Sequence, residues 1–244
     1  MSRNLSHVSL LKRARWLFAV CGVSMLTMLG MTCQNQMPPN GDNEPCPQCL
    51  CTQQPVGTPQ IQAGDHVMSV GNPTVTVFEY SDLACPFCAT FELNTLPTLK
   101  AEYIDTGLVR WVFRHFPITQ LHPRAAKAAE AAECADDQGQ FEAMKTRLFQ
   151  NRTTWGPQSA NDAVATFKAL FGQIPGVNQA AFDTCVDGTG KAARVQTDVN
   201  SGTNLGVSGT PTFYINGRCY RGAISLATFR QILDKAIADA ANSN

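Results

Sequence analysis

The stretch Thr74–Cys88, TVTVFEYSDLACPFC, decides the fold. Its first part, Thr74–Tyr80, is β-branched or aromatic apart from one glutamate, and such a run predicts a buried strand. Ser81 and Asp82 then offer side-chain oxygens that can cap a helix, which we expect to begin at Cys85. The CPFC motif therefore lies where a strand passes into a helix.

The place of the CPFC motif favours redox chemistry. A thiol at Cys85 faces the unpaired N–H groups and the positive dipole end of the helix, which lower a thiol pKa. Cys88 lies one turn further along, close enough for a disulfide, and Pro86 fits the first turn because no donor is needed there. We expect Cys85 to be the attacking thiolate and Cys88 the resolving thiol. The alternatives are a structural disulfide and half of a zinc site.

The rest of the chain supplies the other elements of one α/β domain. We predict a second strand at 108–113, a hairpin around Asn-Gly at 212–221 and a last helix at 225–240. The region between them reads as a run of helices at 125–149, 160–171, 178–185 and 191–205. The order βαβ, helices, ββα predicts a thioredoxin fold with a four-stranded sheet and a helical insertion at about 120–205.

The first 33 residues carry the features of an export signal. Basic residues without any acid precede an apolar run at 16–31, and the first acidic residue is Asp42. The stretch Gly30-Met31-Thr32-Cys33 resembles a bacterial lipobox. Residues 1–33 are therefore a lipoprotein signal with Cys33 as the lipid anchor, a cleaved signal peptide or an uncleaved membrane anchor. Each alternative places the domain outside the cytoplasm, and the first and last tether it to a membrane.

A cysteine-containing segment separates this signal from the domain. Residues 34–65 are rich in Pro, Gln, Asn and Gly, which predicts a flexible linker, and the domain covers 66–244. Ten cysteines in one chain suit an oxidising compartment. Four of them can pair in more than one way: Cys46, Cys49, Cys51 and Cys219. For the CPQCLC cluster in the linker we expect a local structural bridge, with an accessory redox dithiol or a metal site as alternatives.

Composition excludes two classes of protein. Lys+Arg and Asp+Glu number 19 each, so the net charge is zero and the chain lacks the positive charge that is typical of a nucleic-acid binder. The chain is 44% hydrophobic and 16% charged, which excludes disorder of the whole chain. His66, His115 and His122 lack the spacing of a metal site, so we expect no metal there and place these histidines on the surface or in loops.

Four motifs in order resemble the DsbA-like thiol–disulfide oxidoreductases, over roughly 65–240. They are FEYSDLACPFC at 78–88, FRHFP at 113–117, AAEAAEC at 128–134 and GVSGTPTFYING at 206–217. The resemblance implies an extracytoplasmic enzyme that moves disulfides into or between exported proteins. It implies no cofactor beyond a redox-active disulfide between Cys85 and Cys88.

The resemblance also implies a substrate-binding surface. Pro211 is expected to be a cis-proline facing the active-site disulfide, with Thr210 offering its backbone to a bound substrate. Pro86 and Phe87 belong to the same surface. An ordinary trans bond before a strand is the alternative for Pro211, because few X–Pro bonds are cis.

Three more residues take roles from the resemblance. Glu79 is expected to be a catalytic group, the buried acid beneath the active site that exchanges protons with Cys88. The alternative is a glutamate at a strand end that faces solvent. Cys134 and Cys185 fall in two helices of the insertion and resemble the extra structural disulfide of some DsbA-like proteins.

The sequence thus predicts an enzyme that oxidises reduced exported proteins and is reoxidised by a quinone-linked membrane partner. Two residues leave the direction open: Phe87 replaces a thiolate-donating histidine of the best-known enterobacterial DsbA, and Thr210 resembles the choice of disulfide isomerases. The potential should lie between about −120 mV for DsbA and about −270 mV for thioredoxin. The alternatives are a reductase or isomerase fed by a membrane partner, and a metal-binding thioredoxin-like module.

Overall fold

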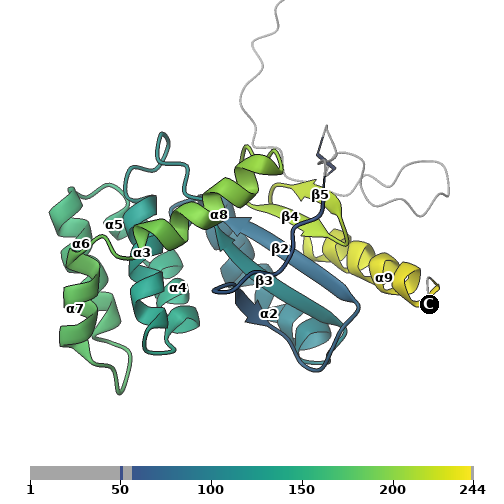
Figure 1. The fold of residues 1–244 in the computed structure, drawn as a ribbon, viewed down its shortest axis with the longest axis horizontal. Coiled ribbons are helices and arrows are strands. Elements are labelled where there is room, and N and C mark those ends of the chain that lie inside the picture. The colour runs from purple at the N-terminus through teal and green to yellow at the C-terminus, as the bar shows by residue number, and fades with distance from the viewer. Residues whose placement is uncertain (1–49, 52–56, 243–244) are drawn as a thin grey trace, which may run out of the picture. The chain divides into compact units, whose positions relative to one another are not determined.

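A five-stranded mixed sheet forms the centre of the fold in the computed structural model, which describes residues 50–51 and 57–242. The sheet has the order β1-β3-β2-β4-β5 (Figure 1). Its strands are β1 (His66–Met68), β2 (Val75–Ser81), β3 (Val109–His115), β4 (Thr212–Ile215) and β5 (Arg218–Arg221). The central pair β2–β3 is parallel and the other neighbours are antiparallel. The predicted thioredoxin fold with a helical insertion is confirmed.

The edge strand β1 corrects the four-stranded sheet expected from the sequence. This strand pairs antiparallel with β3, and His66 lies opposite Phe113. It is only three residues long. A segment this short shows no alternation of apolar and polar residues that could reveal a strand.

The helical segment that carries the CPFC motif begins beside Cys85, as predicted, runs from 86 to 104 and is irregular. The helices α1 (Pro86–Thr90) and α2 (Leu96–Leu99) alternate with the π-helical turns η2 (Phe91–Thr95) and η3 (Lys100–Ile104). Pro97 lies within this segment, and its missing N–H disturbs the regular hydrogen-bond ladder. The segment ends just before Gly107, whose φ is +76°.

The insertion between β3 and β4 is entirely helical. It comprises α3 (Ala125–Asp136), α4 (Phe141–Gln150), α5 (Arg152–Trp155), α6 (Ala160–Phe171), α7 (Gln179–Asp187) and α8 (Ala192–Asn204). The helix expected over 125–149 is in fact two helices, because Gly139 turns the chain between them at a φ of +67°. Helices α3 to α7 gather beyond one end of the sheet, and α8 runs back toward it (Figure 1).

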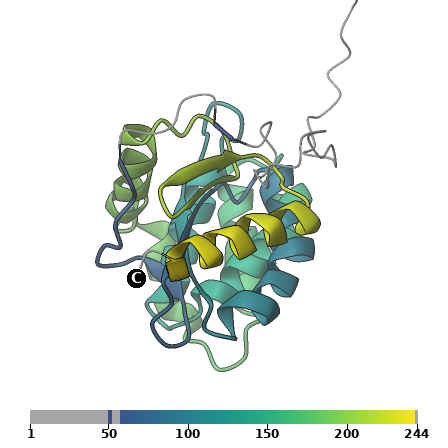
Figure 2. The same cartoon turned by 90° about the vertical axis from the view of Figure 1, so that its right-hand side faces the viewer.

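Apolar side chains cover both faces of the sheet. On one face, the helical segment 86–104 and α9 (Leu226–Asn242), which faces the viewer in Figure 2, bury the side chains of Val77, Trp111 and Phe213. Phe78, Tyr80 and Tyr214 are buried on the other face. A third cluster fills the insertion and includes both cysteines of the CPFC motif. The motif therefore lies where the insertion meets the sheet.

Parts of the expected linker lie against the domain. Cys51 is bonded to Cys219 in β5, so a bridge confined to the CPQCLC cluster is wrong for Cys51. Further along, Arg114 donates to the carbonyl oxygen of Gln60 at 2.6 Å and to the carboxylate of Asp65 at 2.8 Å. The signal assigned to 1–33, Cys33 included, lies outside the described residues, as do Cys46 and Cys49. Within the described ranges, no helix is long and apolar enough to cross a membrane.

Candidate active site

Cys85 and Cys88 lie at the N-terminal end of α1, directly after β2. The helix starts where the sequence predicted, with Cys85 as the N-cap residue and Pro86 as the first helical residue, but the cap expected from Ser81 or Asp82 is wrong because no side chain caps α1. Both cysteines are buried, and they are present as two free thiols. Between them, Pro86 and Phe87 are exposed. The turn thus points its sulfur atoms inward and offers its two middle residues to a partner.

The surroundings drive the pKa values of the two thiols apart. The pKa of Cys85 is lowered to about 6, chiefly by the hydrogen bond from the Cys88 thiol, while burial opposes this and the backbone N–H groups of Cys88 and Phe87 assist. The pKa of Cys88 is raised well above its usual value, first by burial and then by the neighbouring Cys85. At neutral pH Cys85 is therefore the thiolate and Cys88 keeps its proton.

A loop from the far end of the chain contacts the Cys85 thiol. The Thr210–Pro211 peptide bond at the start of β4 is cis, which is the geometry that the resemblance implied. The sulfur of Cys85 lies 3.4 Å from the carbonyl oxygen of Thr210, to which it donates when it is protonated. The structure thereby brings Thr210 and Pro211 next to the CPFC motif, although more than a hundred residues separate them in sequence.

Asp82 organises the turn that carries Cys85. The carboxylate of Asp82 is buried, and one oxygen accepts from the backbone N–H of Ala84 at 2.8 Å. The other accepts from the N–H of Ile118 at 2.8 Å and lies 2.8 Å from Nδ1 of His122. The sequence predicted Asp82 only as a helix cap, because its partners after β3 come from a different part of the chain.

Glu79 is fully buried, which rules out the solvent-facing alternative. Trp111 donates from Nε1 to one carboxylate oxygen of Glu79 at 3.0 Å, and the other oxygen makes no hydrogen bond within the described part of the chain. Burial, followed by the charge of Glu92, raises the pKa of Glu79 to about 8. Ser81 lies on the same face of β2, and its buried hydroxyl makes no hydrogen bond within the described part of the chain.

The sequence did not predict that Lys145, near Glu79, is buried. The ammonium group of Lys145 in α4 lies 3.1 Å from a carboxylate oxygen of Glu92 and 2.9 Å from one of Glu142. The Lys145 side chain is completely buried. A signal was present, since Lys145 follows Phe141 by four residues and precedes Leu148 by three, on the apolar stripe of a predicted helix.

The comparisons with known proteins match this geometry. The family model Thioredoxin_4, described as thioredoxin, matches residues 62–235, a range that holds the CPFC motif, Glu79 and the cis-proline. The chain belongs to this thioredoxin family.

Relatives of this thioredoxin-family chain include proteins of two kinds. It is 34% identical over 176 residues to the Na(+)/H(+) antiporter NhaA 3 of Salinispora tropica, covering 72% of this chain and 25% of the antiporter. It is 26% identical over 189 residues to a candidate protein-disulfide oxidoreductase of Rickettsia typhi, covering 75% of this chain and 66% of that protein. The chain thus spans about a quarter of the length of the antiporter that it matches.

A solved structure supports the DsbA-type assignment. The crystal structure of Wolbachia pipientis alpha-DsbA1 matches with a TM-score of 0.65 at 25% identity, covering 75% of this chain and 96% of that one. Together with the family match, this confirms the resemblance to DsbA-like proteins that the four motifs indicated.

The thioredoxin-family domain has an apolar surface beside its dithiol. A groove of about 240 Å³ opens next to Pro86; its lining includes Ala84, Leu121, His122, Arg124 and Arg152. The side chain of Leu121 is 69% exposed and that of Phe87 45%. Leu121 lines the groove, whereas Phe87 is not part of its lining.

Two other groups of predicted residues lie away from the dithiol. Cys134 and Cys185 are bonded at 2.03 Å and join α3 to α7, the pairing that the resemblance implied. The placement of the histidines on the surface or in loops is wrong for His115, which ends β3 and is fully buried, and for His66, which lies in β1. Their partners come from distant segments, which spacing in the sequence could not show.

Proposed function

We propose that this chain is an extracytoplasmic protein thiol–disulfide oxidoreductase that introduces disulfides into reduced exported proteins. The observation that carries the proposal is the contrast between Cys85, whose pKa is lowered to about 6, and Cys88, whose pKa is raised. One thiol is suited to attack or leave as a thiolate, and the other is suited to stay protonated. No metal or other cofactor takes part in the proposed exchange.

The forward reaction begins with the Cys85–Cys88 disulfide. A substrate thiolate attacks the sulfur of Cys85, a mixed disulfide forms, and Cys88 leaves and takes up a proton. Attack by a second substrate thiolate on the substrate sulfur of the mixed disulfide then releases Cys85 as a thiolate. The substrate loses two electrons and the enzyme gains them. The low pKa of Cys85 makes it a good leaving group in this second step.

Glu79 supports the first step as a proton donor to Cys88. Its pKa of about 8 keeps it protonated at neutral pH, and Ser81 lies on the same face of β2. In the reverse reaction, the same carboxylate accepts the proton of Cys88 when that thiol resolves the mixed disulfide. The Thr210 carbonyl, already within reach of Cys85, offers a backbone acceptor to a bound substrate.

The proposed partners follow from the sequence. Reduced exported proteins are the substrates, and a quinone-linked membrane protein returns the dithiol to the disulfide. Export and a membrane tether rest on the basic and apolar pattern of residues 1–33 and on Cys33 as a lipidation site.

The test compares oxidative refolding of a reduced substrate protein with reduction of insulin. We expect wild-type chain to do both and Cys85→Ser to do neither, while a Cys46→Ser/Cys49→Ser variant keeps both activities. Activity that survives Cys85→Ser would overturn the assignment of the CPFC motif. Loss of activity in the Cys46/Cys49 variant would instead favour an accessory dithiol in the linker.

A reductase or isomerase is the second candidate, favoured by Phe87 and Thr210. Phe87 has no group that donates to the Cys85 thiolate, and its exposed ring faces solvent. A less stabilised thiolate makes a weaker oxidant. Isomerisation of a scrambled disulfide protein, faster than its oxidation from the reduced state, would favour this candidate.

A further inference from the structure

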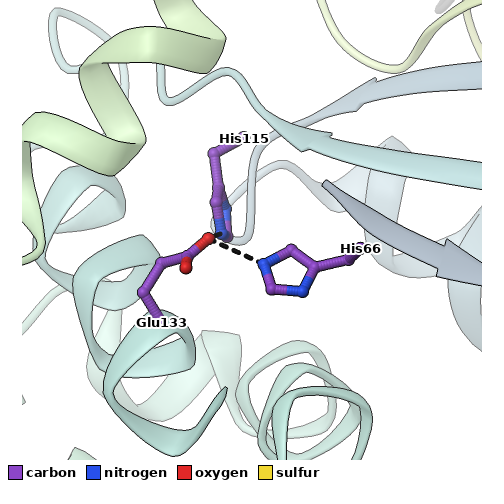
Figure 3. Close-up of side chains that lie close together, drawn as sticks. All are labelled: His66, His115 and Glu133. Carbon is purple, nitrogen blue, oxygen red and sulfur yellow. Dashed lines mark hydrogen bonds and ion pairs between the residues drawn. The ribbon is translucent and has the colours of Figure 1, made fainter. Parts of the chain in front are cut away.

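We propose that His66, His115 and Glu133 form a binding site for a divalent transition-metal ion, with Zn²⁺ the ion that best fits these ligands. Figure 3 shows the two imidazole rings and the carboxylate pointing toward one another. They come from β1, β3 and α3, and the site is separate from the Cys85–Cys88 dithiol. The sequence predicted no metal at these histidines, because the three residues lie far apart along the chain.

The distances between the ligand atoms suit a small ion. Nε2 of His66 lies 2.8 Å from Oε1 of Glu133, and Nε2 of His115 lies 3.1 Å from the same oxygen. One ligand atom from each residue lies within 4.8 Å of the others. Zinc bound at about 2.0–2.2 Å to nitrogen and oxygen in tetrahedral geometry needs ligand atoms a little over 3 Å apart. A small outward adjustment of Glu133 would admit the ion.

His115 supplies an independent reason to expect a ligand here. Its side chain is only 1% exposed; Nε2 faces the Glu133 carboxylate at 3.1 Å without a hydrogen bond, and Nδ1 makes no hydrogen bond within the described part of the chain. A buried polar group without a partner is unfavourable and calls for an explanation. The backbone N–H of His115 donates to Asp198 at 3.0 Å, which fixes the end of β3. A metal ion would bond to Nε2 and to the Glu133 carboxylate that faces it.

His66 is held in the orientation that a metal ligand needs. Its ring stacks on Phe141 with centroids 3.3 Å apart and planes 7° from parallel, which keeps Nε2 toward Glu133. The opposite nitrogen, Nδ1, lies 3.8 Å from a carboxylate oxygen of Asp136. Metal-bound histidines commonly donate their second ring N–H to such a carboxylate. Asp136 is therefore the expected outer partner of His66.

The charges around the cluster are compatible with a dication. The facing charged groups are the carboxylates Asp65, Glu133, Asp136 and Asp198 and the guanidinium groups Arg114 and Arg194. With neutral histidines, four negative and two positive charges leave a surplus of two negative charges. Lys145 lies beyond the rings of Phe113 and Phe141, at 4.8 and 5.9 Å from their centroids, and has its own carboxylate partners.

Arg194 is the cation nearest to the proposed ion. Its Nε lies 3.9 Å from Oε1 of Glu133, the oxygen that the metal would use. The same guanidinium group donates to the carbonyl oxygen of Gly64 at 2.6 Å and to Asp198 at 2.6 Å. Arg194 therefore keeps its hydrogen bonds to Gly64 and Asp198 when Glu133 binds the metal ion.

The site has a route for the ion and a structural consequence. The side chain of Asp136 is 49% exposed while that of His66 is 8% exposed, so the cluster opens to solvent beside Asp136. With three protein ligands, a water molecule would complete the tetrahedron. A bound ion would join β1 and β3 to α3, and the melting temperature should rise with the logarithm of the metal concentration once this exceeds the dissociation constant.

The experiment measures zinc affinity by competition with a chromophoric chelator. Full chain is stripped of metal, kept with the Cys85–Cys88 pair oxidised and treated with an alkylating agent, so that thiols cannot bind zinc. We expect one ion per chain. Glu133→Gln should weaken binding by at least about 100-fold and Asp136→Asn by about 10- to 100-fold, as expected for an inner ligand and an outer partner. Glu130→Gln, on the same helix, is the matched control and should change nothing.

A cobalt-bound sample identifies the ligand type. Co²⁺ in the proposed site should show ligand-field bands without an intense thiolate charge-transfer band. His66→Gln provides a second test if Glu133→Gln does not fold, because the His66 ring lies at the edge of the cluster. Absence of zinc binding by wild-type chain, equal binding by Glu133→Gln or His66→Gln, or a thiolate band would each overturn the proposal.

Discussion

Cys85 and Glu79 depart from their ordinary pKa values in opposite directions, for different physical reasons. The thiolate of Cys85 is stabilised by donors, of which the Cys88 thiol is the strongest, whereas the carboxylate of Glu79 is destabilised mainly by burial. At neutral pH one residue has lost its proton and the other has kept it. In the proposed reaction, these two groups act as a nucleophile and a proton donor.

The first prediction concerns the donor to Cys85. Cys88→Ala removes the hydrogen bond that lowers the Cys85 pKa most, so the midpoint of thiolate formation should rise from about 6 toward 9. The ultraviolet absorbance of the thiolate, followed against pH in the reduced protein, measures this midpoint. Cys85→Ser is the control and should show no transition near pH 6. An unchanged midpoint in Cys88→Ala would show that backbone donors alone stabilise the thiolate.

The second prediction concerns the stability cost of Glu79. Because its pKa rises from 4.5 in the unfolded chain to about 8 in the folded one, the folded state holds a proton that the unfolded state has lost between these pH values. The stabilisation is fully present below pH 4.5 and is lost as pH rises through 8. Relative to Glu79→Gln, wild-type protein should therefore lose at most about 1.4 kcal/mol of unfolding free energy per pH unit across this window.

Denaturant unfolding at several pH values, with both proteins oxidised, measures that difference. Oxidation keeps Cys85 and Cys88 from titrating. A constant difference between pH 4.5 and 8 would mean that Glu79 is ionised throughout, and its proposed role as a proton donor would fail with it.

At the scale of single elements, the sequence predicted those helices, strands and turns that depend on neighbouring residues alone. The strand and the start of the helix around the CPFC motif follow from β-branched residues and Pro86, and the hairpin follows from Asn216-Gly217. The boundary between α3 and α4 was missed because an alanine-rich run hides the turn at Gly139. The edge strand β1 was missed because it forms only against β3.

Residues that act through distant partners were the least predictable. Lys145 and Glu92 are buried because they neutralise each other across two elements, and His115 is buried against Glu133. The residues next to a charged residue in the sequence do not show which distant residue will be its partner. Glu79, Pro211 and the Cys134–Cys185 pair were found in advance only through the family resemblance.

The third prediction is that the Cys134–Cys185 bond stabilises the insertion without affecting the chemistry. The two cysteines are 51 residues apart, and closing a loop of this size is worth about 4 kcal/mol in the chain-entropy model. That is a large part of a typical stability of about 5–15 kcal/mol. A Cys134→Ala/Cys185→Ala variant should melt markedly lower, while its folded form keeps the redox potential of the Cys85–Cys88 pair.

Calorimetry of the variant and its equilibrium with glutathione measure these two properties. The double variant is needed because a single substitution would leave a reactive thiol. Unchanged melting would contradict the structural role, and a changed potential would show that the bond also acts on the active site.

At the scale of the whole molecule, distant parts of the chain are tied to the sheet by a few strong contacts. Arg114, fully buried in β3, donates to Asp65 before β1, to Tyr80 in β2 and to Ser201 in α8. The Cys51–Cys219 bond attaches the segment before the domain to β5 across 168 residues. These contacts hold the frame on which the Thr210 loop meets the CPFC turn.

The fourth prediction is the redox potential, which depends on how far the whole fold stabilises the reduced dithiol. The Cys85 pKa of about 6 lies between about 3.5 for DsbA and about 7 for thioredoxin, and nearer the latter. We therefore expect a potential between about −120 and −270 mV, on the thioredoxin side of the midpoint. Equilibration with glutathione buffers, followed by alkylation and mass spectrometry of the CPFC peptide, measures it.

The variant Phe87→His separates the contribution of the motif from that of the fold. A histidine at this position can donate to the Cys85 thiolate, so the potential should rise by about 30 mV for each tenfold gain in stability of the reduced form. A wild-type value near −270 mV would favour the reductase, because such a dithiol is too stable as a disulfide to oxidise most thiols. A value well above it, raised further by Phe87→His, would support net oxidation driven by a membrane oxidant.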